Sequence, residues 1–301
     1  MRNYCSLGDK KYLPQLICLI DSITSNFKHD YKVHILCLDE YTHNFLKSKY
    51  NQKNINLYSL EQIQEDFTIK ALRYLPAGQE ATANAVSSGK DPQFVQFCWA
   101  LAPCFTDWIM KNYNESVTYV DADIIFFRDM DQFFYELGEK SIGLVRHRID
   151  YIYTSGEFNV GIVHFENDGP GRSSLKFWCD VMKNPRNPYS LGFGTCGDQK
   201  YLEMIHSIYR KDVSIIDKNF GHLAPWNVTF HEYRDDSIFW NGIRQDLTYF
   251  HFAHFVIEEN GYRGSYKNEW IWGDPVKHND KVKKLYDMYY DKIINAAKEL
   301  T

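Results

Sequence analysis

An apolar strand that ends in two closely spaced carboxylates constrains this chain more than any other feature. The stretch VTYVDADIIFFRD, residues 117–129, places Asp121 and Asp123 directly after the strand-forming residues Val117 to Val120. Side chains two positions apart on a strand point to the same face, so both carboxylates can bind one cation. Mg²⁺ and Mn²⁺ prefer such oxygen ligands and leave positions open for phosphate oxygens. The stretch therefore indicates a metal site for a nucleotide substrate.

A plainer interpretation of the two carboxylates is a turn, because Asp is common in turns at strand ends. The apolar residues Ile124 to Phe127 favour the metal site, since carboxylates in such surroundings repel each other unless a metal or a base neutralises them. A helix-loop-helix Ca²⁺ site is excluded, because Phe126 stands where that loop requires Gly.

The composition is that of an ordinary globular protein with one large domain or two closely joined lobes. The chain has 301 residues, 44% of them hydrophobic, and a net charge of −5. Binding a nucleic acid backbone needs a concentrated basic surface, so the scattered Lys and Arg residues argue against that partner. No stretch approaches the roughly 20 apolar residues that span a bilayer, and residues 1–7 lack the apolar core of a signal peptide.

The cysteines predict a reducing, cytoplasmic location. The 7 Cys residues are odd in number and have no short paired spacing, which favours free thiols over a disulfide framework or a zinc site. Without a secretory signal, we interpret the glycosylation patterns at Asn114 and Asn227 as coincidental.

The first 130 residues alternate strand and helix patterns, which is typical of a mainly parallel sheet flanked by helices. The expected strands cover residues 3–7, 33–38 and 55–58, and the expected helices cover 13–27, 43–50 and 93–112. Residues 76–92 are small and polar, and we expect a mobile loop that closes over the substrate.

Beyond Asp129 the pattern is less regular and predicts a second lobe. Helices are expected over 130–137, 172–182 and 197–208, and strands over 142–145 and 159–165. Residues 276–300 form an amphipathic pattern, for which we expect a helix packed on the catalytic lobe; contact with an anionic membrane is the alternative. Its apolar stripe contains Val282, Leu285, Tyr289, Ile293 and Leu300.

Five short motifs follow one another in a characteristic order: YCSLGDKKYLPQL, Asp121-Ala122-Asp123, EFNVGIVHFEN, GDQKYLEMI and YFHFAHF. From Asn3 to about Phe255 the chain resembles the GT-A nucleotide-sugar glycosyltransferases. It is most similar to family 8, the retaining galactosyltransferase and glycogenin group, and to related bacterial polysaccharide enzymes. The resemblance implies an α/β, Rossmann-like fold with a mainly parallel sheet, forming one catalytic domain over 1–301. Within it, 1–128 would bind the nucleotide-sugar, 129–275 the acceptor, and 276–301 would be the C-terminal helix.

The resemblance also implies roles for residues at the matching positions. The metal ligands would be Asp121, Asp123 and His251, with His254 as the alternative to His251. Asp198 and Gln199 would flank the reacting sugar as the catalytic pair, and Trp226 and Asn227 would lie beside the acceptor. The remaining positions would bind the donor: Leu7, Asp9, Tyr12, Asp121, Ala122, Asn159 and Gly161.

Each of these residues also has a structural interpretation. Tyr12 and the His residues can be core residues, Asn159 can cap a turn, and Asp198 can complement a helix start. Their joint occurrence in order favours function. The chain departs from the family at Trp99, where many relatives have a basic residue, and no Lys-Pro-Trp follows the His motif. Arg263 or Lys267 can substitute there as a diphosphate ligand.

The implied function is metal-dependent transfer of a sugar from a nucleoside-diphosphate sugar, a UDP-sugar by the family pattern, to a hydroxyl acceptor with retention of configuration. Mn²⁺ or Mg²⁺ would be the cofactor, and the acceptor would be a saccharide, a lipid-linked molecule or a protein. Two alternatives stay open: a haloacid-dehalogenase-type phosphatase with Asp121 as nucleophile, and a nucleotide-sugar-binding protein without catalysis.

Overall fold

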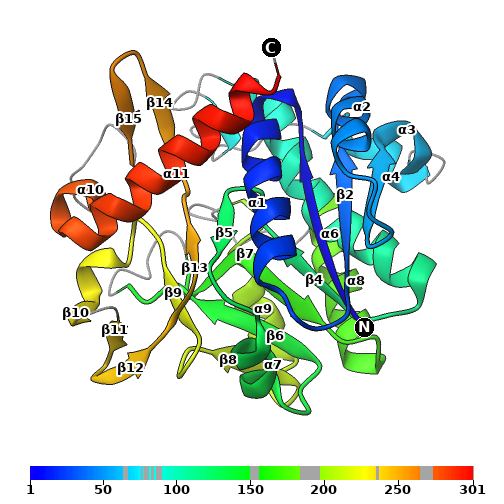
Figure 1. The fold of residues 1–301 in the computed structure, drawn as a ribbon. Helices are drawn as coiled ribbons and strands as arrows, with labels where there is room; N and C mark the ends of the chain where they lie inside the picture. The colour runs from blue at the N-terminus through cyan, green and yellow to red at the C-terminus, as the bar shows by residue number, and fades with distance from the viewer. Residues whose placement is uncertain are drawn as a thin grey trace.

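The chain folds into three layers, with a central sheet between two sets of helices (Figure 1). The computed structural model describes residues 1–63, 67–75, 77, 81–82, 85, 90–149, 156–183, 197–234, 237–264 and 274–300. One face of the sheet carries α1 (Leu13–Asn26), α2 (Glu40–Lys49) and α11 (Asp280–Lys298). The other carries α6 (Pro92–Tyr113), α8 (Gly169–Lys183) and α9 (Tyr201–Ile208).

The described part of the central sheet has seven strands in the order β3-β2-β1-β4-β7-β6-β8. They are β1 (Arg2–Gly8), β2 (Tyr31–Cys37), β3 (Ile55–Ser59), β4 (Val117–Val120), β6 (Ile142–Arg146), β7 (Phe158–Phe165) and β8 (Val213–Ile216). Strands β3, β2, β1 and β4 run parallel, and β7 is antiparallel to both β4 and β6. Because β1 and β4 are parallel neighbours, the segments that follow them meet at one edge of the sheet.

The central strands divide their side chains between two cores. Tyr4 and Val120 pack into the core under α1 and α11, whereas Cys5 and Tyr119 pack into the core under α6 and α8. This division follows from the alternation of side chains along a strand. Both faces of these strands are therefore covered by helices, as in a three-layer α/β fold. The predicted α/β architecture is confirmed.

Smaller elements surround this framework. The helices are α3 (Leu60–Ile63), α4 (Phe67–Leu72), α7 (Asp131–Leu137) and α10 (Pro275–His278), with short 3₁₀ turns at Lys10–Tyr12 and Val228–Phe230. The strands of a second sheet are β5 (Ile124–Phe126), β13 (Leu247–His251) and β9 (Gly221–Leu223). The strands β10 (Glu232–Arg234), β11 (Ser237–Trp240) and β12 (Ile243–Gln245) form a third sheet, and β14 (Val256–Glu258) pairs with β15 (Gly261–Arg263).

The two carboxylates of the opening motif do not lie along one strand as expected. Residues 121–123 form a turn between β4 and β5, and the amide of Ile124 donates to the carbonyl of Asp121 at 3.3 Å. The reason is a change of partner: β4 belongs to the central sheet, whereas β5 pairs with β13 in the second sheet. The apolar run in the sequence therefore covers two strands.

The C-terminal segment consists of two helices rather than one. Asn279 has an extended backbone and caps α11 by accepting the amide of Lys281 at 2.8 Å. The buried side chains of α11 follow the helical period as Val282, Tyr286, Tyr289, Ile293 and Ala296. Leu285 and Leu300 of the expected stripe are only partly buried.

Two other segments differ from expectation. The helix expected from residue 197 begins at Tyr201, after a turn that contains Gly197 at φ +55°. Most of the loop expected over 76–92 lies outside the described residues. Within it, Ala81 and Ala85 are helical and pack, buried, near Val95.

The prediction that all cysteines are free thiols is wrong. Cys104 of α6 and Cys179 of α8 form a disulfide across a sequence separation of 75 residues. Such a separation gives no pattern in the sequence; the packing of α6 against α8 brings the two residues together. Cys5, Cys18, Cys37 and Cys98 are free, and Cys196 lies outside the described residues.

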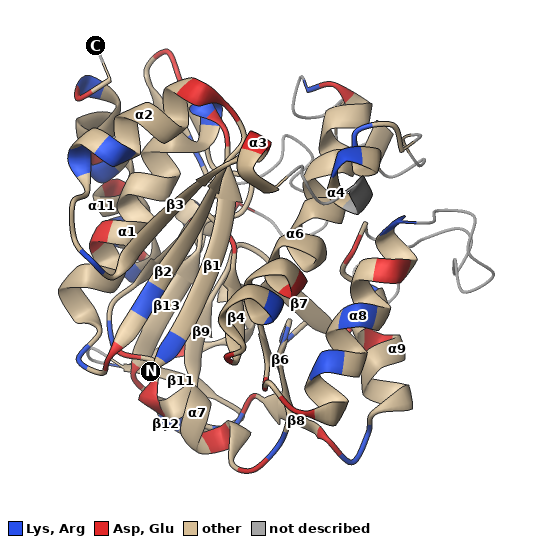
Figure 2. Cartoon of the chain, turned by 90° about the vertical axis from the view of Figure 1, so that its right-hand side faces the viewer, with Lys and Arg blue, Asp and Glu red and all other residues tan. Residues whose placement is uncertain are grey.

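Charged residues of both signs are interspersed along the chain in the view of Figure 2, without a separate group of Lys and Arg. None of the helices described here combines the length and the hydropathy that a membrane span requires.

Candidate functional site

A cluster of two carboxylates and an imidazole lies where β4 and β13 end. His251 Nε2 is 3.0 Å from Asp123 Oδ1 and 3.6 Å from Asp121 Oδ2. The pairing of β13 with β5 places His251 opposite Ile124, and the amide of Phe252 donates to the carbonyl of Asp123 at 2.9 Å. The ligand atoms of the three side chains lie within 4.8 Å of one another, so the set fits a divalent cation.

The charges of this cluster depend on each other. Burial raises the pKa of Asp121, and Asp123 raises it further against the opposing effect of His251. Burial also disfavours the charge of Asp123, but His251 holds the pKa of that carboxyl below its ordinary value. The pKa of His251 is raised, because Asp123 and Asp121 outweigh the effect of burial. The raised pKa values of Asp121 and His251 favour protonation of the cluster, and metal binding would release protons from it.

Asp121 is oriented by its neighbours in the central sheet. The hydroxyl of Tyr119 donates to Asp121 Oδ1 at 2.9 Å, and the Asp121 amide donates to the carbonyl of Gly161 at 2.9 Å. Burial raises the pKa of Tyr119 well above its ordinary value, and the carboxylates of Asp121 and Asp198 add to this effect. Tyr119 therefore stays neutral as a donor, between the metal cluster and the candidate catalytic pair.

Asn159 connects the metal cluster to Gln199. Its Oδ1 is 3.3 Å from His251 Nδ1 and accepts the amide of Gly161 at 2.8 Å. Its Nδ2 donates to Gln199 Oε1 at 3.1 Å and lies 3.3 Å from His147 Nε2. Asn159 is 5% exposed, so its amide group makes its hydrogen bonds within the protein rather than with solvent.

Gly161 is required by this packing. A Cβ atom at position 161 would lie 2.5 Å from Asn159 Oδ1 and 2.6 Å from His251 Nδ1. Both distances are shorter than real carbon contacts, so any side chain there would displace the ring of His251 or the amide of Asn159. The absence of a side chain at Gly161 therefore leaves room for the ring of His251 in its observed position.

The candidate catalytic pair lies on the turn before α9. Asp198 and Gln199 are both buried, and the indole Nε1 of Trp178 donates to the carbonyl of Asp198 at 3.0 Å. Trp99 covers this turn, because a Cβ at Gly197 would lie 2.7 Å from its ring. The position at which the family resemblance implies a basic residue is thus used here for packing.

The nucleotide-binding motif follows β1. Leu7 and Ala122 are largely covered, and Asp9 caps the 3₁₀ turn by accepting the amides of Lys11 and Tyr12 at 3.1 Å each. Burial raises the pKa of Tyr12, and the charges of Asp123 and Asp121 add to this effect.

Lys90 is a part of the site that sequence reasoning missed. Its ammonium group donates to the Tyr12 hydroxyl at 2.9 Å and lies 4.3 Å from the centre of the Tyr12 ring. Burial lowers the pKa of Lys90, and Cys98, Asp9 and Asp123 oppose that effect. A single Lys at the end of a polar segment carries no pattern, so the sequence alone could not assign it.

The predicted acceptor residues lie behind the metal cluster. The Trp226 ring packs edge-on against His251 at 5.2 Å and against His147 at 5.4 Å. Asn227 is fully buried; its Nδ2 donates to the carbonyl of His147 at 3.2 Å and its Oδ1 accepts the amide of Ala224 at 2.9 Å. Asn227 therefore supports the backbone at His147 in this structure.

His254 lies near the cluster but is not one of its three grouped ligands. It has a left-handed backbone conformation, φ +63°, which is uncommon for a residue other than glycine. Burial lowers its pKa to about 4, and the nearby cations Lys90 and Arg263 contribute. Arg263 also pairs with Glu258 at 2.9 Å, and Lys267 lies outside the described residues.

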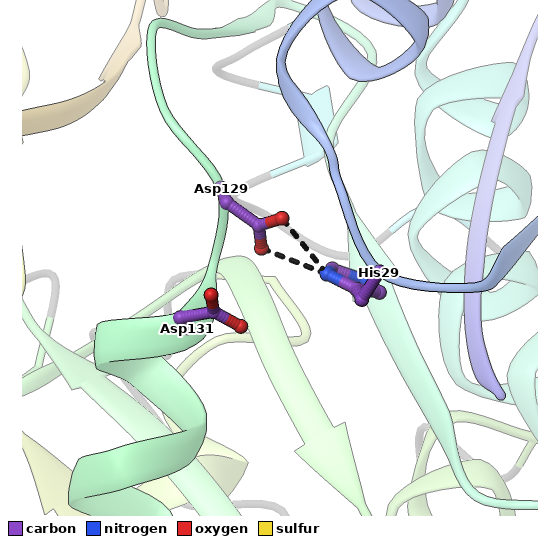
Figure 3. Close-up of side chains that lie close together, drawn as sticks. All are labelled: His29, Asp129 and Asp131. Carbon is purple, nitrogen blue, oxygen red and sulfur yellow. Dashed lines mark hydrogen bonds and ion pairs between the residues drawn. The ribbon is translucent and has the colours of Figure 1, made fainter.

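A second group of potential ligands, His29, Asp129 and Asp131, lies elsewhere in the fold (Figure 3). His29 Nδ1 is 2.8 Å from Asp129 Oδ1. The guanidinium of Arg2 is within 3.0 Å of His29 Nδ1 and 2.9 Å from Asp131 Oδ1. A cationic side chain thus already neutralises these carboxylates, which disfavours a metal there.

Sequence comparisons with known proteins identify distant relatives of this chain. No protein-family model matches the chain. Two proteins of Bacillus subtilis strain 168 that are described as uncharacterized resemble it. YfnF is 26% identical over 275 residues, covering 84% of this chain and 82% of YfnF. YfnD is 21% identical over 272 residues, covering 85% of this chain and 78% of YfnD.

Solved structures of galactosyltransferase LgtC share the architecture. LgtC in complex with donor and acceptor sugar analogs aligns with a TM-score of 0.54 and 12% identity over 95% of each chain. An active-site mutant of LgtC, in which glutamate replaces glutamine, aligns with a TM-score of 0.52 and 12% identity over 83% of this chain and 87% of its own. The chain therefore has the GT-A fold, as the sequence predicted.

Proposed function

We propose that this protein is a metal-dependent glycosyltransferase that moves a sugar from a UDP-sugar to a hydroxyl acceptor with retention of configuration. One observation carries the proposal: Asp121, Asp123 and His251 converge at the edge of a GT-A sheet where β1 and β4 end. In open α/β sheets, ligands bind at that edge. The proposed donor lobe is 1–128 and the acceptor lobe is 129–275.

Asp121, Asp123 and His251 would hold Mn²⁺ or Mg²⁺. When bound, the metal supplies positive charge that stabilises the departing diphosphate. Tyr119 keeps Asp121 in place through its hydroxyl, and Asn159 contacts the far side of the His251 ring. Ligands that are fixed before the donor arrives need little reorganisation during transfer.

Lys90 and Arg263 would supply further positive charge to the diphosphate. Both cations contribute to the lowered pKa of His254, and the charge of Asp123 opposes the lowering of the pKa of Lys90. Tyr12 lies under Lys90 and would stack on the base, with Leu7 and Asp9 on the uridine. Lys90 and Arg263 would thus supply positive charge that this chain lacks at Trp99, where the family resemblance implies a basic residue.

Asp198 and Gln199 would contact the sugar as the catalytic pair. LgtC also has an active-site glutamine, since a glutamate variant of it is described as an active-site mutant. The amide of Gln199 accepts hydrogen bonds from Asn159 and from the backbone of Val160, so it is a poor nucleophile with a fixed orientation. We therefore favour front-face return, in which a leaving diphosphate oxygen takes the acceptor proton and Asp198 holds sugar hydroxyls.

A screen of UDP-, GDP- and CDP-sugars tests this function. We expect one UDP-sugar to raise the melting temperature only with Mn²⁺ or Mg²⁺ present, and to be hydrolysed slowly to UDP and free sugar. Metal-dependent binding without any hydrolysis or transfer would favour the non-catalytic alternative. Phosphate release with a phosphorylated Asp121 would favour the phosphatase.

A further inference from the structure

His147 is a buried histidine with no assigned role, two hydrogen bonds away from His251 of the metal cluster. It lies directly after β6 and is 3% exposed. Its Nδ1 is 2.9 Å from the carbonyl oxygen of Gly156, and its Nε2 is 3.3 Å from Asn159 Nδ2. A carbonyl oxygen only accepts, so Nδ1 carries the proton and the neutral ring offers Nε2 as an acceptor.

The amide orientation of Asn159 follows from its four neighbours. Its two donor positions face the acceptors His147 Nε2 and Gln199 Oε1. Its oxygen faces the amide of Gly161, which can only donate. A flipped amide would place its NH₂ group against this donor, so the contacts permit one orientation.

The protonation of His251 follows in turn. Asn159 Oδ1 can only accept, so His251 Nδ1 must donate the hydrogen bond between them. The other ring nitrogen, Nε2, then faces Asp121 and Asp123. Metal-binding histidines commonly donate their second ring N–H to a fixed acceptor in this manner.

We propose that His147 and Asn159 are positioning residues that fix the ring of His251 so that its Nε2 faces the two carboxylates. This inference rests on the proposed function and changes one expectation: Asn159 acts through the metal ligand and through Gln199 rather than mainly as a wall of the sugar pocket. Because Asn159 contacts both His251 and Gln199, the same residue links the metal cluster to the candidate catalytic pair.

Variants of His147 separate this role from a general loss of packing. His147→Phe keeps an aromatic ring against Trp226 but removes the hydrogen bonds of the two ring nitrogens, including those to Gly156 and Asn159. We expect about tenfold weaker Mn²⁺ binding in the presence of UDP, by calorimetry, as is typical when a residue that supports a metal ligand is changed. His147→Gln can still accept from Asn159 and should recover most of the affinity.

The matched control is His34→Phe. Like His147, His34 is buried with both ring nitrogens bonded, to Tyr58 at 2.9 Å and to Asn3 at 3.2 Å, but it lies outside the cluster. We expect a lower melting temperature with unchanged Mn²⁺ affinity. Equal metal affinity in His147→Phe, His34→Phe and the wild type would overturn the proposal.

A measurement on the metal-free wild-type protein decides the proposal even if His147→Phe does not fold. With ¹⁵N-labelled histidine, long-range ¹H–¹⁵N NMR spectra report which ring nitrogens carry protons. We expect a proton on Nδ1 of both His147 and His251. A His251 ring protonated on Nε2 alone would contradict the inference. Failure of the wild type to bind Mn²⁺ and UDP would instead contradict the proposed function.

Discussion

At the scale of single residues, the three-membered cluster is defined by contacts that the sequence motif only suggested. Asp121 and Asp123 are two positions apart, but a turn rather than a strand brings their carboxylates together. His251 reaches them because β13 pairs with the strand that follows the turn. Two supports complete the cluster, the Tyr119 hydroxyl on Asp121 and the Asn159 amide on His251.

The two histidines of the motif are expected to differ. His251→Ala should weaken Mn²⁺ binding strongly, because it removes the nitrogen 3.0 Å from Asp123 Oδ1. His254→Ala should have the smaller effect, because His254 is absent from the group of three ligands. Titration of Mn²⁺ with UDP present measures both affinities. If His254→Ala lost as much Mn²⁺ affinity as His251→Ala, or more, the metal ligand would be assigned to His254 instead.

Lys90 is expected to act on the diphosphate. Lys90→Met should weaken binding of UDP more than binding of uridine, because only UDP carries the charge that the ammonium group attracts. Lys49→Met is the control: Lys49 also lies over a tyrosine ring, that of Tyr50, and it pairs with Glu299. The two affinities are compared by calorimetry with Mn²⁺ present. Equal losses for uridine and UDP would make Lys90 a packing residue for Tyr12.

At the scale of elements, α11 shows how a surface pattern becomes a packed helix. The ring of Phe252, which directly follows β13, stacks on Tyr289 at 3.9 Å between ring centres. Tyr286 packs edge-on against the Phe252 ring at 5.3 Å. Tyr286 also donates to the carbonyl of Gly264 at 3.0 Å. These contacts join the C-terminal helix to the segment that follows His251.

The C-terminal helix is therefore expected to stabilise the fold rather than to bind membranes. Tyr289→Ala should lower the free energy of unfolding by about 3–5 kcal/mol, the usual cost of truncating a buried aromatic side chain. Urea unfolding measures this change. The intact protein should show no salt-sensitive co-sedimentation with anionic vesicles. Strong binding that high salt abolishes would indicate a membrane-bound acceptor instead.

The elements differed in how well the sequence predicted them. β1, β2 and β3 are rich in strand-forming residues and alternate with helix patterns, so their positions followed from pattern alone. The strand β5 was not separated from β4, because apolar residues continue through both and the change of partner is a tertiary event. Arg148 illustrates the same limit. It is 1% exposed and bonds Asp217, Gln245 and the carbonyl of Phe220, contacts between segments that no local pattern relates.

The residues of the candidate site also differ in how well the sequence predicted them. Residues in motifs, such as Asp123 and His251, were predicted from order and spacing. Lys90 and His147 were missed, because each is a single residue whose role depends on neighbours far along the chain. Asn159 was predicted, but its contacts show a connection to the metal cluster that a motif does not contain.

At the scale of the whole molecule, buried neutral histidines couple stability to pH. Burial lowers the pKa of His34 to about 3, helped by Lys32. Burial lowers the pKa of His231 to about 4, and Arg148 contributes. In the unfolded chain both would titrate near about 6.5. Between these values the unfolded chain binds protons that the folded protein excludes, so stability is lost as the pH falls.

The expected loss is roughly 1.4 kcal/mol per pH unit for each such histidine below the unfolded pKa. Urea unfolding at about pH 7 and about pH 5 measures the difference. His34→Phe should reduce the slope, because it removes one of the titrating groups. Equal stability at both pH values would show that these rings are protonated in the folded protein.

The central claim is that Asp121, Asp123 and His251 bind a divalent metal together with a nucleoside diphosphate. Calorimetric titration of UDP into the wild type and into Asp123→Asn, each with Mn²⁺ and with EDTA, tests it most directly. Asp129→Asn is the control, because Asp129 belongs to the group neutralised by Arg2. We expect Mn²⁺-dependent UDP binding in the wild type and in Asp129→Asn, and its loss in a folded Asp123→Asn protein. UDP binding that is unchanged by EDTA or by Asp123→Asn would contradict the account.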